Sequence, residues 1–293
     1  PKSTVFGGKP RARISSQCIK RAIRMQSLNK MLPEDNRAIR TKRLLEFLTR
    51  KLTESGKDAE ESAAVAAKAI EAAVKAVDKN GKTPYLLYLG KQEIERVMEV
   101  ILDRWDDLKG KKKADKEVTK AFQEVLDGGK AADLALFGRM IADAPDINID
   151  AACQVAHAIS THKVNMEMDY YVAVDDLKPD DTAGADMIGT VEFNSACFYR
   201  YAVIQWNNLI ENLQGDSELA SKAVEAFLKA SLEAIPTGRQ NTFAAHNPPS
   251  LVFAVVRREG MPWSLANAFE AAVRANHKGL VSQSVESLDT YWK

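Results

Sequence analysis

The chain has 293 residues, of which 45% are hydrophobic and 28% charged, and its formal net charge is only +1 at pH 7. This length allows one large domain or a core domain with a substantial insertion, and no stretch reaches the roughly 18 apolar residues of a membrane-spanning helix. The three cysteines form no CxxC pair and are typical of a reducing compartment, so we expect a cytoplasmic protein.

Residues 8–24 carry six cations and no acidic side chain, and the acid-free stretch extends from Pro1 to Pro33. Ser15 or Ser16 is the predicted N-cap of a helix that turns about 100° per residue. The polar stripe of this helix, about 100° wide, holds Gln17, Lys20, Arg21 and Arg24. The opposite, apolar side holds Cys18, Ile19, Ala22 and Ile23. Just before the helix, a strand or loop adds the cations Lys9, Arg11 and Arg13.

Two interpretations of this basic stripe compete. A long surface of one sign suits a run of phosphates better than a single carboxylate. The alternative is an ordinary amphipathic helix whose basic side is solvated, although such helices usually mix both signs. A nearly neutral chain can bind nucleic acid only if its charge is segregated, and this segment shows that segregation.

Residues 27–130 have a helical period and strong helix formers. Helices are predicted at residues 44–48, 60–77, 92–108 and 115–126, with a break at 81–84. The basic loop at 109–113 is either solvated or in contact with a nucleic-acid strand. Because strand-like sequence lies on both sides of this block, we interpret it as an insertion.

After Gly128 and Gly129 the pattern changes to shorter apolar runs, which predict strands within residues 131–141, 154–164 and 187–204. Residues 170–174 and 190–193 are the predicted arms of a long hairpin with a polar tip at 175–184. Predicted helices at 218–234 and 264–276 flank a predicted strand at 251–257. Strands mixed with helices outside a long helical insert predict an α+β fold rather than a doubly wound sheet.

The sequence contains no convincing catalytic arrangement. Gly7-Gly8-Lys9 lacks Walker A spacing, and no GxSxG is present. His157 and His162 are five residues apart, which places them on different faces of a helix or a strand, so they do not form a metal pair. The pairs Asp175-Asp176 and Asp180-Asp181 lie in the polar tip, where a solvated or capping role is commoner than magnesium binding. The residues therefore predict neither an enzyme nor a bound cofactor.

The segment Phe6-Gly7-Gly8, followed by Arg-Ala-Arg-Ile-Ser-Ser-Gln and a Lys-Arg-Ala helix, resembles the CasC (Cse4) family. Further blocks of this resemblance follow, in the family order, at residues 136–140, 156–164, 170–177, 198–201, 243–248 and 264–270. That family supplies the repeated backbone subunit of the type I-E CRISPR Cascade complex. The resemblance implies a ferredoxin-like (RRM-like) palm with a helical finger insertion and a thumb β-hairpin.

The resemblance also implies a division of the chain. Residues 1–26 begin the palm and hold the RNA-binding helix, 27–130 form the helical finger insertion, and 131–164 continue the palm. Residues 165–192 form the thumb hairpin, and 193–293 complete the palm. Members of the family usually have a further segment ahead of the glycine motif that contributes a palm strand, whereas this sequence opens at Pro1.

The implied function is to hold CRISPR RNA (crRNA) by its backbone, without reading its sequence. The expected RNA contacts at the N-terminus are Lys2, Gly7, Gly8, Lys9, Ser15, Gln17, Lys20, Arg21 and Arg24, of which Lys2, Ser15, Gln17, Lys20 and Arg24 match contact positions of the family. Met140 matches a position that packs against bases, although a core methionine is the ordinary alternative. Tyr170, Tyr171 and Val172 match the thumb positions that interrupt the guide–target duplex. Relatives tend to carry Trp-Phe-Thr or Tyr-Phe-Thr there, so this chain lacks the threonine hydroxyl.

The implied partners are crRNA, target DNA paired to the guide, further copies of the chain arranged head-to-tail, and other Cascade subunits. A second basic surface is an additional hypothesis for DNA contact; it would comprise Arg239, Gln240, Arg257, Arg258, Arg274 and Lys278.

Two rival functions stay open. One is a metal-independent endoribonuclease that processes repeat RNA, with His157 or His162 and Tyr199 as candidate groups. The other is a monomeric RNA-binding module that reads sequence.

Overall fold

The chain forms two units, and the boundary between them falls inside the first helix. The computed structural model describes residues 2–74, 78, 81–110, 114–142, 144–173 and 187–293. The first unit comprises residues 1–19, 155–202 and 238–293, and the second comprises residues 20–154 and 203–237.

A four-stranded antiparallel sheet organises the first unit. Its strand order is β1 (Lys2–Phe6), β2 (Lys9–Ile14), β6 (Ala158–Ser160) and β9 (Phe198–Tyr199). Gly7 and Gly8 join β1 to β2 with φ angles of 56° and 67°, the left-handed geometry that a two-residue hairpin turn requires. Ile159 of β6 pairs with Arg13 on one side and with Tyr199 on the other, so distant parts of the sequence meet in this sheet.

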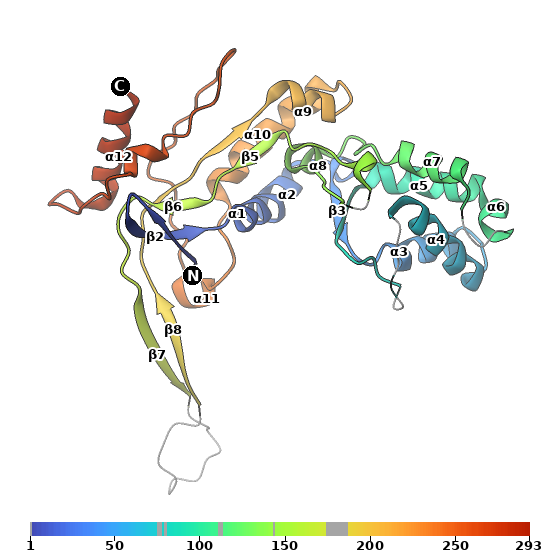
Figure 1. The fold of residues 1–293 in the computed structure, drawn as a ribbon, viewed down its shortest axis with the longest axis horizontal. Helices are drawn as coiled ribbons and strands as arrows, with labels where there is room; N and C mark the ends of the chain where they lie inside the picture. The colour runs from blue at the N-terminus through green and yellow to red at the C-terminus, as the bar shows by residue number, and fades with distance from the viewer. Residues whose placement is uncertain (1, 75–77, 79–80, 111–113, 143, 174–186) are drawn as a thin grey trace, which may run out of the picture. The chain divides into compact units, whose positions relative to one another are not determined.

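A second hairpin of the first unit joins β7 (Glu167–Ala173) to β8 (Met187–Phe193) in antiparallel register along the full length of both strands. Figure 1 shows the pair as a long ribbon that extends away from β2 and β6. Every residue of β7 is exposed. At the base of the ribbon, Phe193 stacks on Phe243 of α11 (Gln240–Phe243), with 5.0 Å between ring centroids. The predicted hairpin is confirmed, and its predicted tip, with the four aspartates, lies outside the described residues.

The C-terminal part of the first unit differs from the prediction. The helix predicted at 264–276 is wrong, because only Ala266–Phe269 form a single 3₁₀ turn, and the helix α12 (Gly279–Trp292) follows instead. Ser284 of α12 donates a hydrogen bond to Thr161 Oγ1 at 2.8 Å, next to β6. The strand predicted at 251–257 is also wrong: its residues are exposed, and no described strand pairs with them. An apolar run favours a strand, but the strand forms only where another backbone lies beside it.

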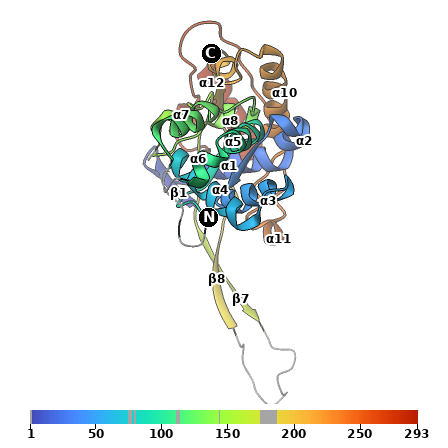
Figure 2. The same ribbon diagram turned by 90° about the vertical axis from the view of Figure 1, so that its right-hand side faces the viewer.

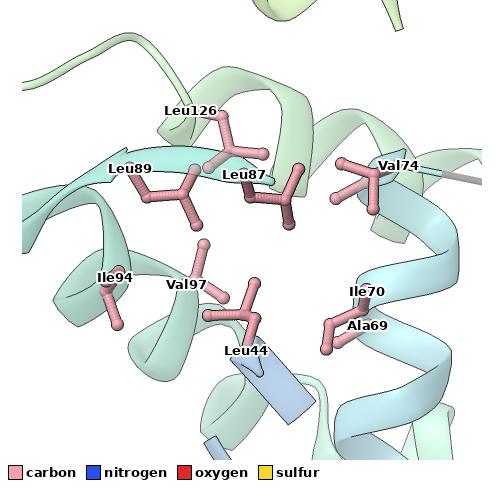
Figure 3. Close-up of a pocket in the computed structure, with 10 residues that line it drawn as sticks. Leu44, Ala69, Ile70, Val74, Leu87, Leu89, Ile94, Val97 and Leu126 are labelled. Carbon is pink, nitrogen blue, oxygen red and sulfur yellow. The ribbon is translucent and has the colours of Figure 1, made fainter. Parts of the chain in front are cut away.

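Helices dominate the second unit. They are α3 (Leu44–Glu54), α4 (Ala59–Val74), α5 (Lys91–Asp103), α6 (Trp105–Gly110) and α7 (Lys116–Val125), which share one apolar core and lie together in Figure 2. They confirm the predicted helices, with a break at Arg104, except that residues 75–77 of the helix predicted at 60–77 lie outside the described residues. Figure 3 shows side chains such as Leu44, Ile70, Leu87 and Val97 converging on a small cavity of this core. Its lining is apolar throughout, so the cavity offers no group for catalysis or ion binding.

Two features of the second unit were not predicted. β3 (Ala38–Thr41) pairs antiparallel with β4 (Leu87–Gly90), so the block at 27–130 is not all helical. Residues 132–137, within a predicted strand, form the helix α8 (Ala132–Phe137). Residues 131–136 are all buried, and a fully buried apolar run has no period that distinguishes a strand from a helix.

Shorter elements complete the chain. After the first helix come a π-helical turn at Arg24–Leu28, α2 (Asn29–Met31) and a 3₁₀ turn at Glu34–Asn36, and another 3₁₀ turn lies at Pro145–Ile147. β5 (Cys153–Val155) pairs with β10 (Ala202–Ile204), and α9 (Trp206–Asn212) and α10 (Ser217–Glu233) follow. α10 confirms the helix predicted at 218–234, and the α+β class is confirmed as a whole. In the described part of the chain, no helix is long and apolar enough to span a bilayer.

A buried ion pair fixes the core of the second unit. The Arg139 guanidinium donates to both carboxylate oxygens of Glu93, at 2.9 and 3.0 Å, and both side chains are almost wholly buried. The same carboxylate accepts the backbone N–H groups of Gly90 and Gly128, each at 2.6 Å. Arg139 also donates to three backbone carbonyl groups. Because every hydrogen-bonding partner lies inside the protein, loss of one charge leaves the other without compensation.

We predict that Glu93→Gln lowers the free energy of unfolding by about 3–5 kcal/mol, because it leaves the buried Arg139 guanidinium unpaired. Urea denaturation followed by circular dichroism measures the change. The matched control is Glu124→Gln, which breaks an exposed pair with Lys120 and should change stability by less than about 0.5 kcal/mol. Equal effects of the two substitutions would contradict this account of the core.

Candidate nucleic-acid interface

The basic helix predicted near the N-terminus is present as α1 (Ser16–Ile23). Ser15 caps it: its carbonyl accepts the N–H of Ile19 at 3.1 Å and its Oγ accepts the N–H of Cys18 at 3.4 Å. Ile19, Ala22 and Ile23 are buried, which confirms the predicted apolar side. Cys18 was also placed on that side, and this is wrong, because it is exposed. The helix buries a narrower stripe than the sequence pattern indicated.

The outer side of α1 presents donors without acidic partners. Gln17 and Arg21 are exposed and Lys20 is half-buried. Among the described residues, no carboxylate lies within ion-pair distance of Lys20 or Arg21. The Lys20 ammonium lies 5.8 Å from the centroid of the Phe137 ring, a cation–π contact that orients this side chain without neutralising it. Such a row of uncompensated donors is suited to an anionic ligand.

Arg24 requires a correction. The sequence predicted it as an open cation, but its Nε donates to Asp133 Oδ2 at 2.8 Å, and the Asp133 side chain is completely buried. Its Nη2 donates to the carbonyl of Ala38 at 3.1 Å, and its guanidinium lies 4.7 Å from the centroid of the Tyr88 ring. Arg24 therefore joins the end of α1 to α8 and β3 within the second unit, and its charge is compensated by Asp133.

The cations of β1 and β2 also separate into exposed side chains and a buried one. Lys2 and Lys9 are exposed, and no ion pair joins either to a described residue. Arg11, which the sequence groups with Lys9 and Arg13 as a cation next to the basic helix, is 0% exposed. It donates to the carbonyls of Ser160 (3.0 Å), Phe269 (2.8 Å) and Glu270 (3.1 Å), and burial lowers the pKa of its guanidinium. Arg11 is thus a structural residue that holds β2 against the C-terminal part of the first unit.

Sequence reasoning missed a role of His157. Its Nδ1 accepts the backbone N–H of Ser16 at 3.3 Å and lies 3.0 Å from Arg13 Nη1. His157 therefore satisfies one of the free N–H groups at the start of α1 and also fixes the Arg13 side chain. Arg13 and Ser16 are more than 140 positions from His157 in the sequence, so no local sequence pattern could reveal these contacts.

The two turn glycines differ. A Cβ atom on Gly7 would lie 1.8 Å from the carbonyl oxygen of Glu270, so this side of the turn is packed against the protein. A Cβ atom on Gly8 would have no heavy atom of a non-neighbouring residue within 4 Å. Gly8 is therefore open to a ligand, whereas Gly7 serves the close approach of two backbones.

Met140 and the hairpin residues are exposed. The exposed fraction of Met140 is 88%, which excludes the alternative of a core methionine. Tyr170 is 71% exposed, and Tyr171 and Val172 are about half exposed. Because side chains alternate along a strand, Tyr170 and Val172 lie on one face of β7 and Tyr171 on the other, where its ring covers Gly189. The three residues therefore do not form one continuous stacking surface.

Two of the three candidate catalytic groups, His162 and Tyr199, are engaged in structural contacts, whereas the third, His157, is exposed and contacts described residues through its Nδ1. His162 is buried; its Nε2 accepts the N–H of Cys197 at 3.2 Å, and its Nδ1 lies 2.9 Å from the carbonyl of Lys163. The Tyr199 hydroxyl accepts the N–H of Leu265 at 2.9 Å. Burial raises the pKa of the Cys153 thiol to about 12, so it stays protonated. Within the described ranges, no three His, Cys, Asp or Glu side chains are grouped so as to hold a metal ion.

The additional basic surfaces are partly compensated. Lys278 pairs with Glu286 at 2.8 Å, and Arg257 donates to the carbonyl of Met261 at 2.8 Å. Lys109, at the start of the predicted basic loop, pairs with Glu61 at 2.5 Å, and residues 111–113 lie outside the described residues. Arg239, Arg258 and Arg274 are exposed.

Comparisons with known proteins give a family and two similar structures. The family model described as CT1975-like protein matches residues 1–293. A chain of the solved "CRISPR RNA-guided surveillance complex, pre-nicking" is 30% identical with a TM-score of 0.83, and the match covers 99% of this chain and 81% of that chain. A chain of a "CRISPR RNA-guided surveillance complex" is 27% identical with a TM-score of 0.69, over 99% of this chain and 79% of that chain. No curated protein matches the chain significantly.

We predict that Gly7→Ala destabilises the protein more than Gly8→Ala. Both substitutions place a side chain at positive φ, which costs about 1–2 kcal/mol, but only Gly7→Ala also drives a methyl group into the Glu270 carbonyl. Thermal unfolding of the two variants measures the difference, and Gly8→Ala is the matched control. Equal losses would show that Gly7 does not approach Glu270 closely.

Proposed function

The chain belongs to the CT1975-like protein family, as its resemblance to CasC (Cse4) predicted, and from this premise we propose that it is a crRNA-binding backbone subunit of a CRISPR Cascade surveillance complex. Its role in antiviral defence would be to hold the guide RNA and present it for pairing with target DNA. The similarity to chains of two CRISPR RNA-guided surveillance complexes supports this assignment.

The observation that carries the proposal is that each unit, taken by itself, presents uncompensated cations, on the β1–β2 hairpin in the first unit and on α1 in the second. Lys20 and Arg21 on α1, and Lys2 and Lys9 on the hairpin, form no ion pair with a described residue. Phosphate contacts position a strand without reading its bases, as required of a protein whose guide differs from one RNA to the next. Gln17, Ser15 and the open backbone at Gly8 would add neutral hydrogen-bonding groups.

We further propose the type I-E arrangement, in which copies follow one another head-to-tail along the RNA. A heterologous contact that does not close produces a filament, and the length of the RNA then limits it. The exposed Met140 is available to pack against bases, and the exposed Tyr170 ring offers a flat face for stacking. The antiparallel sheet of the first unit is compatible with the ferredoxin-like palm of this proposal.

The proposed role does not include catalysis. A metal-independent endoribonuclease needs a free general base beside a reacting hydroxyl. Both ring nitrogens of His162 lie at backbone groups, and the Tyr199 hydroxyl accepts a backbone N–H, which argues against either as the catalytic group. The other candidate, His157, is exposed, so incubation of the chain with CRISPR repeat RNA decides whether it cleaves RNA.

We predict that the double variant Lys20→Ala/Arg21→Ala binds single-stranded RNA about 10- to 100-fold more weakly than the wild type. It should do so for any base sequence, because the lost contacts are to phosphates. The slope of log affinity against log salt should decrease by about 1.4, since each lost single-strand phosphate contact contributes about 0.7. Fluorescence anisotropy with labelled RNA at several salt concentrations measures both quantities.

The control for this experiment is Lys116→Ala/Lys120→Ala, which removes two exposed lysines of α7 in the same unit and should leave affinity unchanged. Arg24 is not a suitable position, because its substitution would also break the buried pair with Asp133. Wild-type affinity of the Lys20/Arg21 double variant would refute the RNA-binding role of α1.

We predict that the number of bound copies rises in integer steps with RNA length and that the RNA stays intact. Native mass spectrometry on a series of RNA lengths, including CRISPR repeat RNA, measures both. A fixed stoichiometry at all lengths would favour the monomeric module, and a specific cut in the repeat RNA would favour the endoribonuclease.

A further inference from the structure

Beyond α1, the second unit contains an exposed arginine held in place by a buried aromatic ring. Tyr88 of β4 is buried, and its cross-strand partner in β3 is Arg40. The Arg40 guanidinium lies 4.7 Å from the Tyr88 ring centroid, at the same distance as the guanidinium of Arg24. The two guanidinium carbons are thus no more than twice that distance apart. One ring therefore orients two cations, one of which directly follows α1.

The charges around this ring do not balance. Asp133 is the carboxylate of the cluster, and its oxygens accept Arg24 Nε (2.8 Å) and the backbone N–H groups of Ala38 (2.7 Å) and Leu134 (3.1 Å). Burial raises the pKa of Tyr88 well above its ordinary value, so the ring stays neutral. Arg40 is exposed, and no described carboxylate lies within ion-pair distance of it. The cluster therefore contains two cations and one anion, and the excess charge is on the exposed side chain.

The position of Arg40 continues the row of cations on α1. Arg21 and Arg24 are three residues apart, a rise of about 4.5 Å at 1.5 Å per residue. Arg24 then contacts the same ring as Arg40. A strand of nucleic acid that follows Lys20 and Arg21 toward the end of α1 would thus meet Arg40 next. The planar guanidinium of Arg40 is suited to the two oxygens of a phosphodiester, and its contact with Tyr88 restricts its orientation in advance.

We propose that Arg40, oriented by Tyr88 beside Arg24, is a further contact for a phosphodiester of the bound RNA. This inference rests on the proposed RNA-binding function and extends the basic surface from α1 onto β3. It also gives a role to Arg24, which positions the cluster through Asp133 while Arg40 faces the ligand.

The test compares Arg40→Ala, Arg40→Gln and Arg40→Lys with Arg43→Ala. Arg43 is an exposed arginine three residues later that pairs with Glu46 at 3.5 Å, which makes it a matched control. We expect Arg40→Ala and Arg40→Gln to weaken binding of a mixed-sequence single-stranded RNA by about 3- to 10-fold. The slope of log affinity against log salt should decrease by about 0.7, whereas Arg40→Lys should keep the wild-type slope.

Two results are distinguishable. If the Lys20/Arg21 double variant loses affinity but both Arg40→Ala and Arg40→Gln bind like Arg43→Ala, the inference about Arg40 is overturned and the proposed function stands. If the wild type does not bind RNA, or if the double variant binds like the wild type, the proposed function itself fails. Thermal unfolding of each variant accompanies the measurement. Because Arg40→Gln keeps a long polar side chain over Tyr88, it gives the decisive result if Arg40→Ala is unstable.

Discussion

The buried carboxylate of Asp133 is the interaction on which the basic surface of the second unit depends. It accepts Arg24 at the end of α1 and the backbone N–H of Ala38 at the start of β3. It thereby joins the helix that carries Lys20 and Arg21 to the strand that carries Arg40. A completely buried carboxylate with such partners is rigidly held, because any rotation would leave the charge without compensation. Asp133 therefore fixes the end of α1 and the start of β3, the two elements that carry Arg21 and Arg40.

The chain uses its arginines in two distinct ways. Arg11, Arg24 and Arg139 are directed inward, where backbone carbonyls or buried carboxylates compensate them. The exposed cations of α1 and of the β1–β2 hairpin find no such compensation within the described residues. In a chain of net charge +1, this division determines which cations of the N-terminal segment stay open to an anionic ligand. It explains how a nearly neutral protein can present a surface for a polyanion.

The exposed apolar residues follow a similar logic. Met140 and the side chains of β7 lie in solvent in the isolated chain, although burial would stabilise them by removing apolar area from water. In the proposed assembly, bases and neighbouring copies would cover them. The alternation of Tyr170 and Tyr171 between the faces of β7 means that only one of these rings can stack on a given side.

The sequence by itself determined the family and those local elements whose signals are short-range, whereas α8, β3, β4 and the chain between residues 251 and 276 were not predicted correctly. Ser15 and the period of residues 16–23 give α1, the Gly7-Gly8 turn is consistent with the N-terminal hairpin, and strong helix formers give α3 to α7. Each of these elements depends on residues within a few positions of one another, so the sequence of the segment is enough to predict it. Only the tertiary structure decided which cations stay open. The partner of Arg24 is 109 positions away, and those of Arg11 are up to 259 positions away. Ion pairing and burial are set by such distant contacts, so a stripe that looks uniform in the sequence separates into structural arginines and exposed ones.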